Sequence, residues 1–170
     1  ILIDTGIGNK QDDKFFSHYY LHGNDNLEKS LKNAGYSRDD VTDVFLTHLH
    51  FDHCGGAVHW KNNERNILEP YFKNAIYWSN KEHWKWANQP NSREKASFLK
   101  ENISPIKESG QLKFIKREGQ FSKSVLPNMD VFFADGHTES QMIPIIKYKD
   151  KSIAFMADLL PSVGHIPLPY

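Results

Sequence analysis

Thr47-His48-Leu49-His50-Phe51-Asp52-His53-Cys54-Gly55-Gly56 is the stretch that decides how this chain is interpreted. Three histidines and one aspartate fall between His48 and His53. Imidazole and carboxylate groups are ligands that zinc, iron, manganese and nickel accept in proteins. The pattern therefore indicates a metal centre, and hydrolysis by a metal-activated water is the first hypothesis that it supports.

The residues before this motif predict a strand that ends at it. Residues 41–47 are rich in β-branched and aromatic side chains, which is typical of a strand. Alternate residues of an extended segment point to the same side, so His48 and His50 should face one way and Leu49 the core. Open α/β sheets place their chemistry on the loops at these strand ends.

Two ligand-type side chains follow strands further along the chain. Residues 129–134 lead into His137, which follows Gly136, and the apolar residues 153–157 lead into Asp158. Strand ends can gather distant side chains into one rigid site. With His48 and His50 on a first cation, Asp52 and His53 would serve a second one nearby, and a carboxylate can bridge two cations.

The remaining pattern predicts an α/β fold with one domain over residues 1–170. A long polar and aromatic loop should follow Gly8. Strands are expected at 1–3, 75–78, 112–116, 129–134, 141–148 and 151–157, with a tight turn at Lys149-Asp150. Helices are expected from Asn24 or Asp25 to Gly35, from Asn80 to Ala87, and from Ser92 to Glu101 or beyond, bent or broken near Pro105.

Composition excludes several function classes. Lys plus Arg equals Asp plus Glu at 21 each, so nothing marks the chain as a nucleic-acid binder. No apolar run approaches the ~20 residues that span a bilayer. We expect a small-molecule substrate and no membrane partner. A single cysteine, Cys54, leaves the compartment open; the cytoplasm is favoured, with the periplasm or secretion as alternatives because the chain opens on Ile1 without a Met.

At the motif His48-x-His50-x-Asp52-His53 the chain resembles the metallo-β-lactamase fold superfamily. The resemblance extends to Asp4-Thr5-Gly6, to Gly136-His137-Thr138 and to Met156-Ala157-Asp158, in the order that the family uses. It implies part of an αββα sandwich and a dinuclear site, most often of zinc, with iron or manganese as alternatives. It also suggests a homodimer.

The resemblance further implies a role for each candidate residue. His48, His50 and His137 would hold the first metal, Asp52 and His53 the second, and Asp158 would bridge them. A metal-bound hydroxide would attack an ester-like bond, and Asp52 and Asp158 would be the catalytic carboxylates. Within the superfamily, Cys54-Gly55-Gly56 and the loop after Gly8 look most similar to quorum-quenching lactonases and methyl-parathion-hydrolase-like phosphotriesterases. A lactone, aryl ester or phosphotriester is therefore the expected substrate.

The chain departs from the family pattern at two places. The family supplies one more histidine to the second metal after the bridging aspartate, and it begins with extra strands before Asp4. The domain over residues 1–170 is therefore expected to be incomplete at both ends. His165 lies too near Asp158 to be that ligand, although it could line the pocket. Leu159-Leu160-Pro161 stands where lactonases of this branch often have a tyrosine, which weakens a lactonase assignment in particular.

Other interpretations remain open. A glyoxalase-II-like thioesterase, or a persulfide-dioxygenase-like enzyme with one iron, would use a similar motif. A metal-binding protein or inactive fragment without turnover is the alternative outside enzymes. Cys54 is expected to be a small buried residue, and Asp4 either orients a histidine or stabilises its turn. Surface or loop positions are predicted for His18, His22, His59 and His83.

Overall fold

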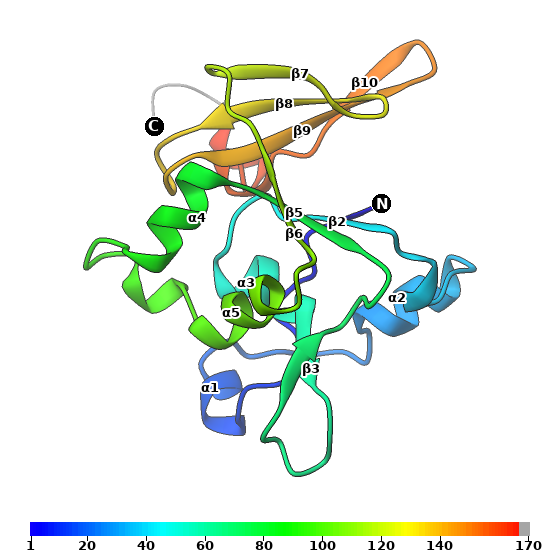
Figure 1. Ribbon diagram of the computed structural model, residues 1–170, viewed down its shortest axis with the longest axis vertical. Helices are drawn as coiled ribbons and strands as arrows, with labels where there is room; N and C mark the ends of the chain where they lie inside the picture. Colours follow the sequence, from blue (N-terminus) through cyan, green and yellow to red (C-terminus); the bar gives the residue numbers. More distant parts are fainter. Residues whose placement is uncertain (167–170) are drawn as a thin grey trace.

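A parallel sheet forms the middle layer of the molecule. The computed structural model describes residues 1–166, and Figure 1 shows their arrangement. The sheet has the strand order β1-β2-β5-β6, and every neighbouring pair is parallel. Its strands are β1 (Leu2–Ile3), β2 (Asp43–Phe45), β5 (Ile76–Asn80) and β6 (Leu112–Ile115). The carboxyl ends of these strands therefore lie at one edge, as predicted for β2.

A second, antiparallel sheet packs on the first. Its order is β10-β9-β8-β7. The strands are β7 (Phe121–Leu126), β8 (Met129–Ala134), β9 (Gln141–Tyr148) and β10 (Lys151–Ala154). A small hairpin of β3 (Val58–Trp60) and β4 (Leu68–Pro70) stands apart from both sheets. Lys149, at φ 54°, forms the tight β9–β10 turn that the sequence predicts.

Helices cover the other face of the parallel sheet. The α-helices are α1 (Asp13–Ser17), α2 (Leu27–Asn33), α3 (Phe51–Cys54), α4 (Lys81–Asn88) and α5 (Lys100–Glu108). Short 3-10 turns are η1 (Arg38–Asp40), η2 (Gly55–Ala57), η3 (Lys95–Ser97), η4 (Ala157–Leu159) and η5 (Val163–His165). Gly35, at φ 84°, ends α2 as expected. No helix within residues 1–166 has the length and apolar character of a membrane span.

Strand β2 shows why both faces of the parallel sheet are buried. Val44 belongs to the core beneath the helices, together with Tyr77 and Ile106. Its neighbour Phe45 points the other way, into a core shared with Val131 and Phe133 of the antiparallel sheet. Successive side chains of a strand alternate between faces, so one short strand serves both cores. The α/β class is confirmed, with layers in the order helix, parallel sheet, antiparallel sheet.

The helix predicted from Ser92 to Glu101 is wrong. The Asn91 side chain accepts from the Glu94 backbone N–H at 2.9 Å, which favours a local turn over a helix. Helix α5 instead begins at Lys100 and includes Pro105, where a break was expected. The aromatic loop after Gly8 also holds a short helix, α1, whose first turn is capped by Asp12.

The strand predicted to run to Ala157 ends early. Pairing of β10 with β9 stops at Ala154, and Phe155 then donates to the Pro144 carbonyl at 3.2 Å. Proline has no N–H to return that bond, so the ladder cannot continue. Asp158 therefore lies on the turn η4 rather than at a strand tip, and all four residues of β10 are exposed.

Candidate metal centre

The motif residues occupy the segment between β2 and η2. His48 is fully buried, and His50 precedes α3, whose four residues include Asp52 and His53. Gly55 and Gly56 allow this segment to touch the loop after β1: a Cβ at Gly55 would overlap the Ile7 carbonyl, and one at Gly56 the Thr5 carbonyl. The glycines after the motif therefore let the ligand segment pack directly on another backbone.

Two groups of side chains converge as potential metal ligands. His48, His50 and His137 form one group, and His48, His53 and Asp158 form the other. In each group one ligand atom per residue lies within 4.8 Å of the others. Nε2 of His137 is 3.1 Å from Nδ1 of His50, a close approach of two ring nitrogens. The structure thus brings together five of the six predicted ligands.

Asp158 belongs to the second group and also approaches the first. One carboxylate oxygen is 3.2 Å from Nε2 of His53, and the other is 3.3 Å from Nε2 of His137. Asp158 therefore lies close to one histidine of each group. The sixth predicted ligand, Asp52, is half exposed, and its carboxylate is 3.7 Å from Nε2 of His53. It lies at the edge of the second group rather than within it.

Asp4 orders the ligand segment through a network of hydrogen bonds. Its carboxylate accepts from the backbone N–H of Thr47 at 2.8 Å, from the Thr47 hydroxyl at 2.7 Å and from Nδ1 of His53 at 2.8 Å. The Thr47 hydroxyl is also 3.0 Å from Nδ1 of His48. Asp4 therefore both orients a histidine and stabilises its loop, the two roles that the sequence suggested.

These contacts engage Nδ1 of His48 and Nδ1 of His53, and they leave Nε2 of each of these two rings available for a metal. Nε2 of His48 is buried and has no hydrogen-bond partner among residues 1–166. Burial, helped by the neighbouring histidines, holds the pKa of His48 well below its usual value. Burial and His137 lower the pKa of His50 to about 4. Both rings are thus neutral near pH 7, as ligands must be.

His53 has the opposite electrostatic balance. Burial opposes its protonation, but the hydrogen bond and charge of Asp4, with Asp52 and Asp158 nearby, outweigh that effect and raise its pKa. Three carboxylates around one imidazole attract a cation, whether a proton or a metal ion. The second ligand group is therefore suited to a divalent ion.

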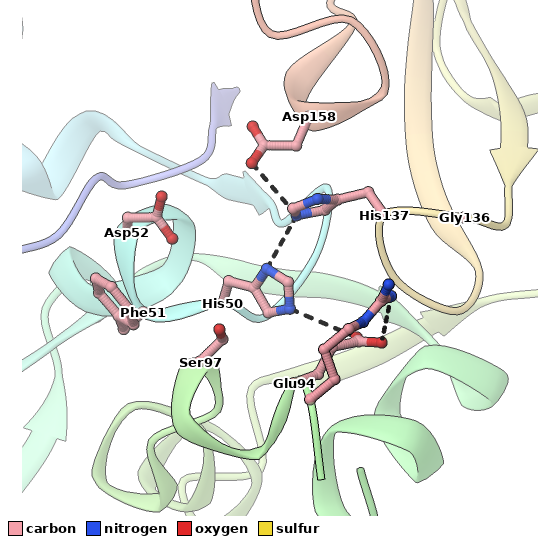
Figure 2. Close-up of a pocket in the computed structure, with 9 residues that line it drawn as sticks. His50, Phe51, Asp52, Glu94, Ser97, Gly136, His137 and Asp158 are labelled. Atoms are coloured by element: carbon pink, nitrogen blue, oxygen red, sulfur yellow. Dashed lines mark hydrogen bonds and ion pairs between the residues drawn. The ribbon is translucent and has the colours of Figure 1, made fainter. Parts of the chain in front are cut away.

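A cavity of about 360 Å³ opens beside the ligands (Figure 2). Figure 2 shows His50 between His137 and Glu94, with Asp158 beyond His137. Its lining residues are His50, Phe51, Asp52, Arg93, Glu94, Ser97, Gly136, His137 and Asp158. His165 is not one of them; it is exposed on η5, with Nδ1 2.8 Å from the Ser162 hydroxyl.

Glu94 is a cavity residue that sequence reasoning missed. Its carboxylate accepts from Nε1 of Trp86 at 3.0 Å and lies 3.7 Å from Nε2 of His50. Burial raises the pKa of Glu94, but hydrogen bonds, that from Trp86 foremost, outweigh burial and lower it. Glu94 thus places a fixed negative charge behind His50. No motif surrounds it, so only the fold reveals its position.

Among the remaining histidines, His18 and His22 are exposed as predicted, and His59 is half-buried beside Glu69. The prediction of a surface or loop position is wrong for His83, which is fully buried in α4. The sequence held one signal for the position of His83: it stands three residues after Asn80, the end of β5, and the carboxyl ends of parallel strands meet at the site.

Cys54 is buried as expected, and burial raises its pKa to about 12, which excludes a thiolate nucleophile near neutral pH.

Comparisons with known proteins identify the family of this chain. Residues 1–170 match the profile described as "Metallo-beta-lactamase superfamily". An N-acyl homoserine lactonase of Bacillus cereus is 23% identical over 166 residues, which cover 92% of this chain and 57% of the lactonase. The chain thus spans little more than half the length of this relative.

Solved structures show the same fold. A probable metal-dependent hydrolase from Staphylococcus aureus superposes with a TM-score of 0.80 at 24% identity, covering 96% of this chain and 55% of that one. AidC, a dizinc quorum-quenching lactonase in complex with a product, gives a TM-score of 0.68 at 24% identity, covering 93% and 52%. At these identities the likeness supports the fold alone.

Proposed function

The chain belongs to the metallo-beta-lactamase superfamily, and from that premise we propose that it is a hydrolase that cleaves an ester-like bond at a dinuclear metal centre. The position of Asp158 carries the proposal. One of its oxygens faces His53 and the other faces His137, each within 3.3 Å, so one carboxylate could serve both ligand groups. A carboxylate that only stabilised its own turn would not need to direct each of its two oxygens at a different histidine.

The residues present fit two divalent cations. His48, His50 and His137 would hold the first, and His53, Asp52 and Asp158 the second, with Asp158 shared. The buried Nε2 of His48 supports this assignment, because it has no hydrogen-bond partner within residues 1–166. Left without a metal, this unsatisfied nitrogen would cost about 1–3 kcal/mol of folding free energy. Zinc suits this nitrogen and oxygen ligand set, and iron or manganese would also be accepted.

When bound, the two cations would lower the pKa of a bound water and would polarise the carbonyl or phosphoryl oxygen of the substrate. Asp4 and Thr47 hold the histidine rings in the required orientation. Asp52 is half exposed at the cavity wall, where its carboxylate would be able to accept a proton and return it to the substrate. Phe51 offers one apolar surface to the substrate.

The cavity lining supports a polar substrate. Arg93, Glu94 and Ser97 line the cavity together with the proposed metal ligands. A substrate with hydrogen-bonding groups beside its ester would use them, whereas a purely alkyl chain would bury them unpaired. Lactones are the first class to test because the curated relatives carry the name N-acyl homoserine lactonase. Aryl esters and phosphotriesters are the other two classes.

Turnover tests the proposal. The zinc-loaded protein should hydrolyse at least one lactone, aryl ester or phosphotriester, and His50→Ala should reduce that rate by at least about 100-fold because the first ligand group is broken. His59→Ala is the matched control, since His59 lies in β3 and does not line the cavity. Oxygen uptake with one iron would instead support a dioxygenase. Metal binding without turnover would support a binding protein.

A further inference from the structure

A buried histidine that belongs to neither ligand group joins the two loops that carry the ligands. His83 lies in the first turn of α4 and is fully buried. Its Nε2 accepts from the backbone N–H of Leu49 at 2.8 Å, and its Nδ1 donates to the carbonyl of Glu139 at 2.6 Å. Leu49 stands between His48 and His50, and Glu139 stands two residues after His137. One side chain therefore spans both loops.

The two bonds require a single state of the ring. The Leu49 amide can only donate, and the Glu139 carbonyl can only accept. The neutral tautomer with its proton on Nδ1 satisfies both partners, whereas an imidazolium would direct an N–H at another N–H. Because the ring is fully buried, it has no solvent to replace a lost partner. The contact is therefore specific to histidine in this tautomer.

Asn80 strengthens the same connection. Its side-chain oxygen accepts from the His83 backbone N–H at 2.8 Å, which caps α4, and its amide donates to the Ser140 carbonyl at 2.8 Å. Asn80 is the last residue of β5, which pairs with β2 in the parallel sheet. The sheet that delivers His48 thus also supports the residues that hold the His137 loop.

We propose that His83 is a positioning residue of the metal centre: it fixes the separation between the loop of His48 and His50 and the loop of His137. This inference rests on the proposed function, because it assumes that these histidines share a cation. Groups that orient ligands without touching the metal commonly change metal affinity by 10–100-fold when they are removed. His83 instead acts through its hydrogen bonds to the backbone of both loops.

Two substitutions separate the two bonds. His83→Asn keeps a donor at the place of Nδ1 and loses the acceptor for Leu49, while His83→Gln keeps an acceptor at the place of Nε2 and loses the bond to Glu139. Zinc affinity is measured by competition with a chromophoric chelator, and exchange of the Leu49 amide is followed in the metal-free protein. We expect both variants to bind zinc about 10-fold or more weakly. Only His83→Asn should expose the Leu49 amide to faster exchange.

The matched control is Ser122→Ala. Ser122 is buried in β7, where its hydroxyl donates to the Lys116 carbonyl at 3.1 Å and accepts from the Glu118 N–H at 3.1 Å. Its loss should lower Tm without changing zinc affinity, since neither bond involves the loop of His48 and His50 or the loop of His137. If wild type binds zinc and both His83 variants bind it equally well, the positioning role is overturned while the proposed function stands. If wild type binds no zinc, both are overturned.

Discussion

At the scale of single residues, the site depends on which nitrogen of each imidazole is free. Asp4 and Thr47 occupy Nδ1 of His53 and His48, so Nε2 of each ring faces the ligand group. His50 is reversed: its Nδ1 faces His137 and its Nε2 faces Glu94. Metal-ligating histidines generally direct their second nitrogen at an oxygen, which fixes ring and tautomer. Asp4 is the residue on which most of this order depends.

Asp4→Asn tests that role. Asp4 adopts φ 53°, which asparagine tolerates, so the backbone should be retained. The substitution removes the charge and replaces an acceptor by an amide donor beside Thr47 and His53. We expect about 10–100-fold weaker zinc binding in a chelator competition. Asp12→Asn, at the exposed cap of α1, is the control and should bind like wild type. Equal affinity of Asp4→Asn and wild type would refute the role of Asp4.

The stability of the metal-free protein should depend on His83 in acid. Burial lowers the pKa of His83 from 6.5 to about 4. Between these values the unfolded chain binds a proton that the folded state does not, so stability is retained above pH 6.5 and is lost as pH falls toward 4. One histidine contributes at most about 1.4 kcal/mol per pH unit in this window. The free energy of unfolding, measured in urea at a series of pH values, should fall more steeply with falling pH for wild type than for His83→Gln. Parallel pH dependences for the two proteins would contradict this role of His83.

At the scale of elements, the ligand segment depends on close backbone contact. The N–H of Gly56 donates to the Gly6 carbonyl at 3.0 Å, and the N–H of Thr5 donates to the His53 carbonyl at 2.8 Å. Lys10 also reaches this segment, since its buried ammonium donates to the Gly55 carbonyl. The β1 loop and the α3–η2 segment thus behave as one unit that holds His53 next to Asp4.

Gly55→Ala should disrupt that unit. A methyl group at Gly55 would overlap the backbone of Ile7, which cannot rotate away as a flexible side chain could. We expect a loss of about 1–3 kcal/mol or more in the free energy of unfolding, measured by denaturant titration. Gly164→Ala is the control, because its nearest neighbour would be the Ser162 hydroxyl at 3.5 Å. A Gly55→Ala protein as stable as wild type would show that the segments are not in contact.

Elements with strong patterns could be predicted from sequence, and elements set by local side-chain contacts could not. The β-branched run before His48 and the hairpin at Lys149 were predicted, because both follow from local conformational preference. The late start of α5, at Lys100 instead of Ser92, was missed, since it depends on the Asn91 side chain accepting from the Glu94 backbone N–H. The early end of β10 depends on Pro144 in a different strand.

At the scale of the whole molecule, the site lies where two sheets meet. The parallel sheet delivers His48 and His50, while the antiparallel sheet delivers His137 through the loop after β8. The N–H of Met142 donates to the Thr47 carbonyl at 2.8 Å and joins the sheets directly beside the ligands. At the start of the His137 loop, Arg117 donates to the Asp135 carboxylate at 2.7 Å.

The same view explains which site residues the sequence could identify. The motif residues and His137 follow strands β2 and β8 and stand near glycines, and both signals are visible in the sequence. Asp158 was singled out by the apolar run before it, although it lies on the turn η4 and not at a strand end. Glu94 comes from a segment without such a signal, and it joins the site through its contact with Trp86 of α4. For His83 the only signal was indirect, its place three residues after the end of β5, and the packing of α4 against both loops brings it to the site. A residue that reaches the site through one contact between distant segments leaves no local pattern in the sequence.

The most direct test of the central claim is the metal content of the protein. Zinc is titrated into metal-free wild type and His50→Ala, and bound metal is counted by atomic emission after gel filtration. Wild type should retain two zinc ions per chain, and His50→Ala should lose the ion held by His48, His50 and His137. A wild-type protein that retains no divalent ion would contradict the account.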